Sequence, residues 1–125
     1  MMILNNEEVS ALLSMENCLR HLEAAYRELA EGAAVNRPRS DLYLPATSSN
    51  GVYCFKTMEG ALSREKVVAL RLNSDVIKWE EKGGRIIKEK VPAAPGNKWV
   101  GLVLLFSAET GEPLAIFPDG IIQGI

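Results

Sequence analysis

The stretch that decides the fold is Gly101–Gly120, GLVLLFSAETGEPLAIFPDG. Two runs rich in Val, Leu, Ile and Phe flank Thr110-Gly111. Runs of this composition favour strands, and a glycine between them favours a tight turn. The stretch therefore predicts a β-hairpin.

On the C-terminal side of this hairpin, Asp119-Gly120 indicates a turn or the start of a helix. A chain terminus is usually a frayed polar tail or a capped, docked helix, and this one is neither. We expect the architecture to continue beyond it, and we expect three apolar side chains to be buried: Ile121, Ile122 and Ile125.

On the N-terminal side, GVYCFKTM and VVALRLNSDVI have strand-like compositions. IKWEEKGGRIIKEK predicts a second hairpin, because Gly83-Gly84 can adopt the positive φ values of a tight turn. NRPRSDLYLP is expected to be extended, since Pro38 and Pro45 disfavour helix in the residues before them.

Two helices are predicted before these strands. Asn6 is a plausible N-cap for the first helix, Ser14 begins the second, and Gly32 suits its C-terminal end. Glu23 and Arg27 are spaced as a favourable i,i+4 pair on the polar face. The second helix carries one apolar stripe at helical spacing, made of Met15, Leu19, Leu22, Tyr26 and Leu29.

Helices followed by strands predict an α+β fold with a mostly antiparallel sheet, in one domain over residues 1–125. The chain is 47% hydrophobic and 24% charged, which is typical of a globular protein. We find no internal repeat and no low-complexity segment.

Charge and motifs exclude several classes of partner. A net charge of −2 and a pI near 5.5 provide no basic field for nucleic acid, and no apolar run is long enough to span a bilayer. The N-terminus MMILNNEEV lacks the pattern of a signal peptide, so we expect a cytoplasmic protein. Cys18 and Cys54 are expected to be buried free thiols, and His21 has no partner at metal-ligand spacing.

The candidate binding residues are basic side chains in strand-like surroundings: Arg39, Lys56 and Arg71. Strand alternation places Arg71 on the same side as Ala69 and Asn73. Arg71 then either faces solvent or offers a fork of donors to a carboxylate. The charges of GGRIIKEK indicate a solvated hairpin, and Trp79 and Trp99 favour core or interface positions.

The order NRPRSDLYLP, FKTMEG, VALRLNSD and GLVLLFSAETGEPLAIFPDG resembles the N-terminal part of the ornithine cyclodeaminase/mu-crystallin family, over about Ile3 to Ile125. In that family a strand, a "TGxPLA" turn and a second strand lead to an Asp-Gly and an arginine-bearing helix. A Rossmann domain with a glycine fingerprint follows. The resemblance implies that this chain is a substrate-binding and dimerisation domain, and that the NAD(P)-binding domain lies outside the sequence.

The resemblance also implies roles for single residues. Arg39 matches the arginine that grips the substrate α-carboxylate, and Arg71 stands where many members have a lysine contacting the same group. Lys66 is a poorer match for that lysine. Lys56 occupies the position of a carboxylate in members that cyclise ornithine, and a lysine there would repel a diamine. We expect no catalytic, cofactor-binding or metal-binding residue within this sequence.

By this resemblance, the full-length parent transfers hydride between an amino or imino acid and NAD(P), and pairs as a homodimer through this domain. The sequence itself contains no GxGxxG, P-loop, GxSxG or HExxH motif. The residues leave an alternative open, which is a free-standing small-ligand-binding or structural module of mu-crystallin type without catalysis.

Overall fold

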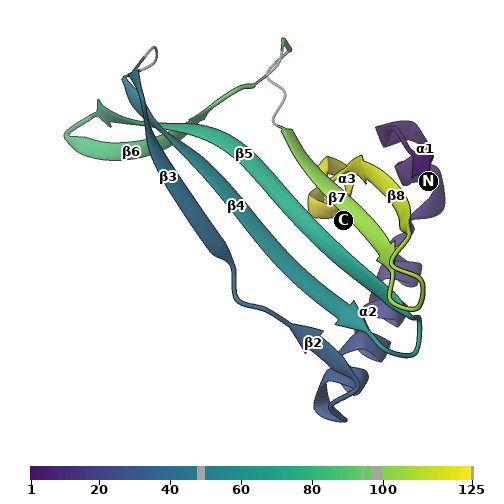
Figure 1. Cartoon of the computed structure of the whole chain (residues 1–125). Coiled ribbons are helices and arrows are strands. Elements are labelled where there is room, and N and C mark those ends of the chain that lie inside the picture. The colour runs from purple at the N-terminus through teal and green to yellow at the C-terminus, as the bar shows by residue number, and fades with distance from the viewer. Residues whose placement is uncertain (48–49, 94, 97–99, 125) are drawn as a thin grey trace.

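A computed structural model describes residues 1–47, 50–93, 95–96 and 100–124 (Figure 1). The helices of this part of the chain are α1 (Asn6–Leu12), α2 (Met15–Ala30) and α3 (Gly120–Gly124). Its strands are β1 (Met2–Ile3), β2 (Ala34–Asn36), β3 (Ser40–Ala46), β4 (Gly51–Leu62), β5 (Val67–Lys82), β6 (Arg85–Val91), β7 (Val100–Ser107) and β8 (Pro113–Pro118).

The strands form one sheet with the order β1-β8-β7-β5-β4-β2, in which β3 also pairs with β4 and β6 with β5. Every pairing between described strands is antiparallel except that of β1 with β8, which is parallel. The predicted α+β class is therefore confirmed. The parallel strand β1 was not foreseen.

Both predicted hairpins are present, and glycine backbone geometry accounts for both turns. Lys82 pairs with Arg85 across Gly83 and Gly84, whose φ angles are 61° and 76°. Gly111, with φ of 76°, lies in the turn between β7 and β8. Only glycine adopts such angles without a steric penalty, so these turns are encoded locally.

The helix ends follow capping chemistry, with one correction. Asn5, and not Asn6, is the N-cap of α1, because it forms a capping box with Glu8. Ser14 caps α2 by accepting a hydrogen bond from the Asn17 amide at 3.1 Å, as predicted. Gly32 follows α2 with φ of 74°, which also agrees with the prediction.

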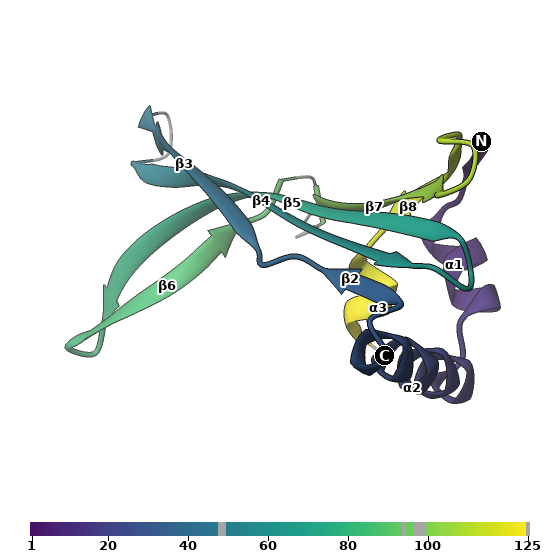
Figure 2. The ribbon, with the colours of Figure 1, turned by 60° about the horizontal axis from the view of Figure 1, so that its bottom comes forward.

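All three helices lie on one side of the sheet, which we call the helix side (Figure 2). The antiparallel register places Arg71 opposite Met58 and Asn73 opposite Lys56, so these four residues share a face. That face is the helix side, because Arg71 and Asn73 both contact Asp119 immediately before α3. The other side, which we call the bare face, has no helix over it (Figure 2). Its apolar side chains include six from three strands: Leu70, Leu72, Leu102, Leu104, Phe106 and Ile116.

The core is small. Among the described residues, the buried hydrophobic ones are Val9, Cys54, Ile77, Val103 and Ala115. The chain exposes 8903 Å² of surface, whereas a compact monomer of 13.7 kDa exposes about 6,600 Å². A surplus of roughly 2,300 Å² indicates that much apolar surface is not buried within these residues.

The expectation that Ile122 is buried is wrong, because Ile122 is exposed. The apolar stripe of α2 is largely exposed as well, and Trp79 is exposed, which excludes the core position and leaves the interface position. Cys18 and Cys54 are free thiols, but only Cys54 is buried. Ile125 and Trp99 lie outside the described residues. No helix in the described part of the chain is both long and apolar enough to cross a membrane.

Candidate functional site

The centre of the helix side holds a group of charged side chains that we call the charged row. Its members come from four strands, from the residue before β3 and from the residue before α3, and they include one uncharged amide, Asn73: Arg39, Asp41, Lys56, Arg71, Asn73, Asp75, Lys90 and Asp119. The register explains how they meet, because Asp41 lies opposite Lys56 and Lys56 lies opposite Asn73. Neighbours across an antiparallel ladder project to the same face.

Arg71 is held by a buried carboxylate. Its Nε donates a hydrogen bond to Asp119 Oδ2 at 3.0 Å, and Asn73 Nδ2 donates to the same oxygen at 3.0 Å. The Asp119 amide is itself fixed, since it donates to the Gly101 carbonyl at 3.0 Å. The hydrogen bonds made by Arg71 within the described residues use Nε alone, so both terminal nitrogens of the fork remain for a ligand.

Gly101 makes this arrangement possible. It lies opposite Asn73 in the ladder between β5 and β7. A Cβ atom built on Gly101 would lie 2.2 Å from Asp119 Oδ1 and 2.4 Å from Asn73 Nδ2. Because Gly101 has no side chain, the Asp119 carboxylate can occupy this space.

A second carboxylate, Asp75, pairs with two lysines. Lys56 Nζ donates to Asp75 Oδ2 at 3.0 Å, and Lys90 Nζ lies 3.1 Å from the same oxygen. Burial would raise the pKa of Asp75, but the contacts with Lys56 and Lys90 outweigh it and lower the pKa below its ordinary value of 3.8. Asp75 is therefore ionised at neutral pH.

The third carboxylate, Asp41, lies at the end of the row formed by β3. Arg39 Nη2 donates to Asp41 Oδ2 at 2.9 Å, and the Tyr43 hydroxyl donates to the same oxygen at 2.8 Å. The hydrogen bond from Tyr43, together with that from Arg39, lowers the pKa of Asp41. The same Tyr43–Asp41 bond raises the pKa of Tyr43 to about 12, because ionisation would remove the donor.

The structure thus brings the three predicted binding residues to one side of the sheet. Arg39, Lys56 and Arg71 all project to the helix side, and each is paired with an aspartate. Lys66, the poorer match, instead pairs with Glu109 in an exposed turn. No group of three or more His, Cys, Asp or Glu residues in the described part of the chain is arranged to hold a metal ion.

Sequence reasoning missed the partners of these residues. Asp75, Asp119 and Lys90 were not identified as partners of these residues. Lys90 is exposed, as expected for a solvated hairpin, but its ammonium pairs with Asp75, a carboxylate that is 3% exposed. The available signal was Asp75 itself, because a charged residue in an apolar strand requires a counterion.

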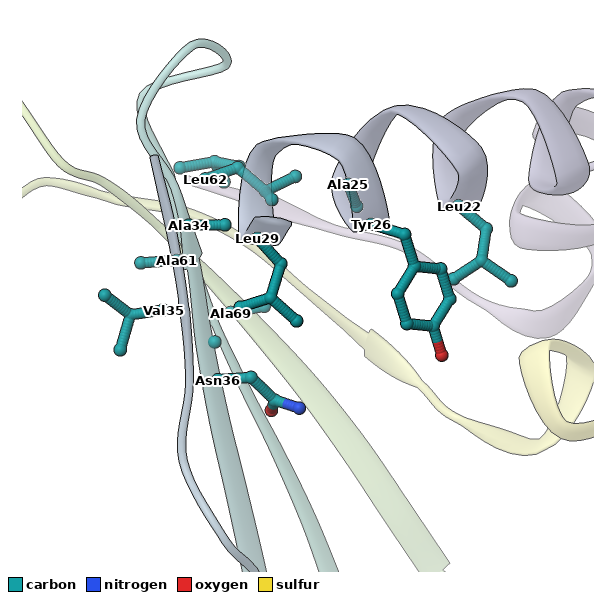
Figure 3. A pocket seen from close by; sticks show the side chains of 12 residues that line it. Leu22, Ala25, Tyr26, Leu29, Ala34, Val35, Asn36, Ala61, Leu62 and Ala69 are labelled. Atoms are coloured by element: carbon teal, nitrogen blue, oxygen red, sulfur yellow. The ribbon is translucent and has the colours of Figure 1, made fainter. Parts of the chain in front are cut away.

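A separate hollow lies between α2 and the end of the sheet, and we call it the apolar cleft. It has a volume of about 310 Å³ and is lined mostly by apolar side chains. Leu22, Tyr26 and Leu29 of α2 project toward Ala69 and Asn36 of the sheet (Figure 3). No charged residue lines the cleft, so it offers no cation to a carboxylate.

Comparison with known proteins gives matches to solved structures only. No protein-family model matches the sequence. No curated protein matches it either.

Three solved structures each align with 98% of this chain. They are a probable ornithine cyclodeaminase from Bordetella pertussis Tohama I (16% identity, TM-score 0.70), an iminosuccinate reductase from Paracoccus denitrificans in complex with NAD+ (19%, 0.64), and an archaeal alanine dehydrogenase dimer with bound NAD (26%, 0.65).

The chain therefore has an ornithine cyclodeaminase/mu-crystallin-like fold. Two of these three proteins, the iminosuccinate reductase and the alanine dehydrogenase, have NAD bound in their structures. The match covers 32%, 33% and 32% of those three chains, in the order given. The chain thus spans about a third of the length of the solved proteins that it resembles.

Proposed function

We propose that this chain is the substrate-binding and dimerisation part of an NAD(P)-dependent oxidoreductase that acts on an amino or imino acid. The observation that carries the proposal is the geometry of Arg71. Asp119 fixes its guanidinium through Nε, which leaves two parallel N–H donors directed away from that pair. A free carboxylate is the group that this fork binds bidentately.

Arg39 provides a second cation for the same carboxylate. Its side chain is 55% exposed, and its ion pair with Asp41 is at the margin of the charged row. Asp41 is only 17% exposed, so Arg39 keeps this partner and shares its exposed guanidinium with the ligand. Arg39 and Arg71 therefore act as the exposed and the more deeply held parts of one carboxylate clamp.

NAD(P) does not fit the described residues. A dinucleotide site needs parallel strands joined by a helix, with a glycine-rich turn at the helix N-terminus. The parallel pairing of the described strands is limited to the two residues of β1 against β8. In the proposed enzyme, residues outside this sequence hold the cofactor, and the charged row supplies charge and orientation for the substrate.

A second copy of this chain is the proposed occupant of the bare face. Six apolar side chains from β5, β7 and β8 project there, and no helix of the described chain covers them. The surplus surface of roughly 2,300 Å² per chain is sufficient for a stable homodimer, which buries about 2,000 Å² or more in total. The archaeal alanine dehydrogenase with this fold is a dimer.

The carboxylate clamp is tested by titrating the ¹⁵N-labelled chain with L-alanine and with L-alaninamide, which lacks only the carboxylate charge. We expect L-alanine to shift the amide signals of residues 71 and 73, and L-alaninamide to leave them unchanged. Arg71→Lys keeps the charge but removes the fork, and should weaken binding about tenfold.

Arg39→Ala should weaken binding several-fold, while Arg37→Ala is the matched control. Arg37 lies two residues away, and its side chain is 73% exposed and pairs with Glu59 at 4.0 Å. Equal binding of L-alanine and L-alaninamide would contradict the carboxylate clamp. Binding that persists alongside a clean monomer in sedimentation velocity would instead favour a free-standing binding module.

A further inference from the structure

The charged row does not balance its own charges. Four cations, Arg39, Lys56, Arg71 and Lys90, meet three carboxylates, Asp41, Asp75 and Asp119. Asp41 pairs with Arg39, and Asp119 pairs with Arg71. The surplus positive charge therefore lies at Asp75, where two lysines share a single carboxylate oxygen.

The second lysine at this position adds less stability than the first. One ammonium neutralises one carboxylate, and the second adds repulsion between two like charges that contact the same oxygen. Lys56 is also largely removed from water, with 14% of its side chain exposed. A surplus charge held in a poorly hydrated position is stabilised by a further anion.

The surplus positive charge lies close to the carboxylate clamp on the same face of the sheet. Lys56 is opposite Asn73, and Arg71 precedes Asn73 by two residues on the same face. Residues two apart in a strand are about 7 Å apart, and both side chains are long. The Arg71 fork and the Lys56 ammonium can therefore hold the two ends of one short, doubly anionic molecule.

We propose that Lys56, Asp75 and Lys90 form a subsite for the side-chain carboxylate of a dicarboxylic amino or imino acid. This inference rests on the proposed function, because the α-carboxylate is placed by Arg71. Asp75 holds the two ammonium groups together in the free protein, and the ligand carboxylate supplies the missing negative charge. A cationic side chain, such as that of a diamino acid, is repelled by the same surplus.

The experiment is a ¹⁵N NMR titration of the 125-residue chain with L-glutamate, L-glutamine and L-ornithine at one ionic strength. Glutamate and glutamine have nearly the same shape and differ by one charge. We expect L-glutamate to bind about tenfold more tightly than L-glutamine, the effect of one partly screened charge, and L-ornithine to bind most weakly. The amides of residues 56, 75 and 90 should shift with L-glutamate and not with L-glutamine.

Two variants change the surplus charge in opposite directions. Lys90→Gln removes the surplus charge and should abolish the preference for glutamate over glutamine. Asp75→Asn doubles the surplus charge and should increase the preference for glutamate over glutamine severalfold. A pair of lysines with a purely structural role would leave the ratio of the two affinities unchanged in both variants.

The outcomes separate this inference from the function on which it rests. If glutamate and glutamine bind equally well to the unaltered chain, the dicarboxylate subsite is wrong and the carboxylate clamp stands. If none of the three amino acids binds, both proposals are overturned. Should Asp75→Asn fail to fold, Lys90→Gln decides the question alone, because Lys90 is 44% exposed and tolerates replacement.

Discussion

The charged row and the α2 stripe reverse the usual rule of burial. Asp75 and Asp119 are each 3% exposed, whereas Leu22 and Tyr26 of α2 are 53% and 64% exposed. Charged residues are rarely buried unless they are paired, and large apolar side chains are usually inside. Each aspartate of the charged row has its counterions within the chain, but the apolar stripe has only the edge of the sheet along one side. The aspartates of the charged row are thus paired within the chain, whereas the α2 region still has apolar surface to bury.

The largest contrast is expected between two aliphatic truncations. Ile77→Ala should lower the free energy of unfolding by about 3 kcal/mol, because the residue is 1% exposed and its removal leaves a cavity. Leu19→Ala in the α2 stripe should change it by less than about 0.5 kcal/mol. Urea denaturation measures both values. A loss of similar size at Leu19 would mean that the stripe is already packed in solution, and would remove the contrast between the two regions.

Gly101→Ala tests whether the charged row depends on close packing. The added methyl group must displace Asp119 or Asn73, and we expect a loss of about 2 kcal/mol together with weaker binding of L-alanine. Gly120→Ala is the matched control, since a Cβ there meets nothing within 4 Å. Thermal unfolding of both variants gives the comparison, and equal stability would show that the Asp119 contacts are not rigid.

The pairing of Asp75 predicts a dependence of stability on pH. Its folded pKa lies below the unfolded value of 3.8, so its contribution is present above about pH 3.8 and is lost as the pH falls through the folded pKa. Lys90→Gln should cost about 1 kcal/mol at neutral pH, discounted for the exposure of the lysine. The difference from the unaltered chain should then disappear in acid, where Asp75 is protonated.

Urea denaturation at a series of pH values measures that difference. Arg85→Gln is the control, because Arg85 is an exposed cation of the same strand, β6, without a contact to Asp75 among the interactions of the described residues. A difference between Lys90→Gln and the unaltered chain that persists unchanged at low pH would contradict the pairing.

The smallest expected effect is spectroscopic. The hydrogen bond to Asp41 raises the pKa of Tyr43 to about 12, so one tyrosine should ionise well above the ordinary value of 10.0 in an absorbance titration near 295 nm. Stability linked to Tyr43 is present below pH 10.0 and declines as the pH rises through about 12. Asp41→Asn should lower this pKa, and Tyr43→Phe should remove the high-pH step from the curve. A curve unaltered by Tyr43→Phe would rule out the assignment.

The sequence predicted those parts of the molecule that short-range chemistry controls. Gly83-Gly84 and Gly111 specify their turns by backbone conformation, Ser14 specifies a helix start, and alternation placed Arg71 on the correct face of its strand. The partner of Arg71 could not be predicted, because Asp119 lies 48 residues away and reaches it only through the register of β7 and β8.

Burial of the α2 stripe and the pairing of Lys90 could not be predicted either, because both depend on residues far away in the sequence. The spacing of Met15, Leu19 and Leu22 shows which side chains could pack together, but a periodic pattern contains no information on whether another surface is present to cover them. Lys90 has the local features of a solvated lysine, and only the diagonal position of β6 relative to Asp75 distinguishes it from Lys88.

The parallel pairing of β1 with β8 has a consequence for synthesis on the ribosome. Met2 pairs with Ala115 and Ile3 with Ile116, so the first strand made must wait for the last strand of the sheet. At usual elongation rates this delay is on the order of ten seconds. The helices α1 and α2 need only neighbouring residues and can form during that interval, which makes the β1–β8 pairing a late event in vectorial folding.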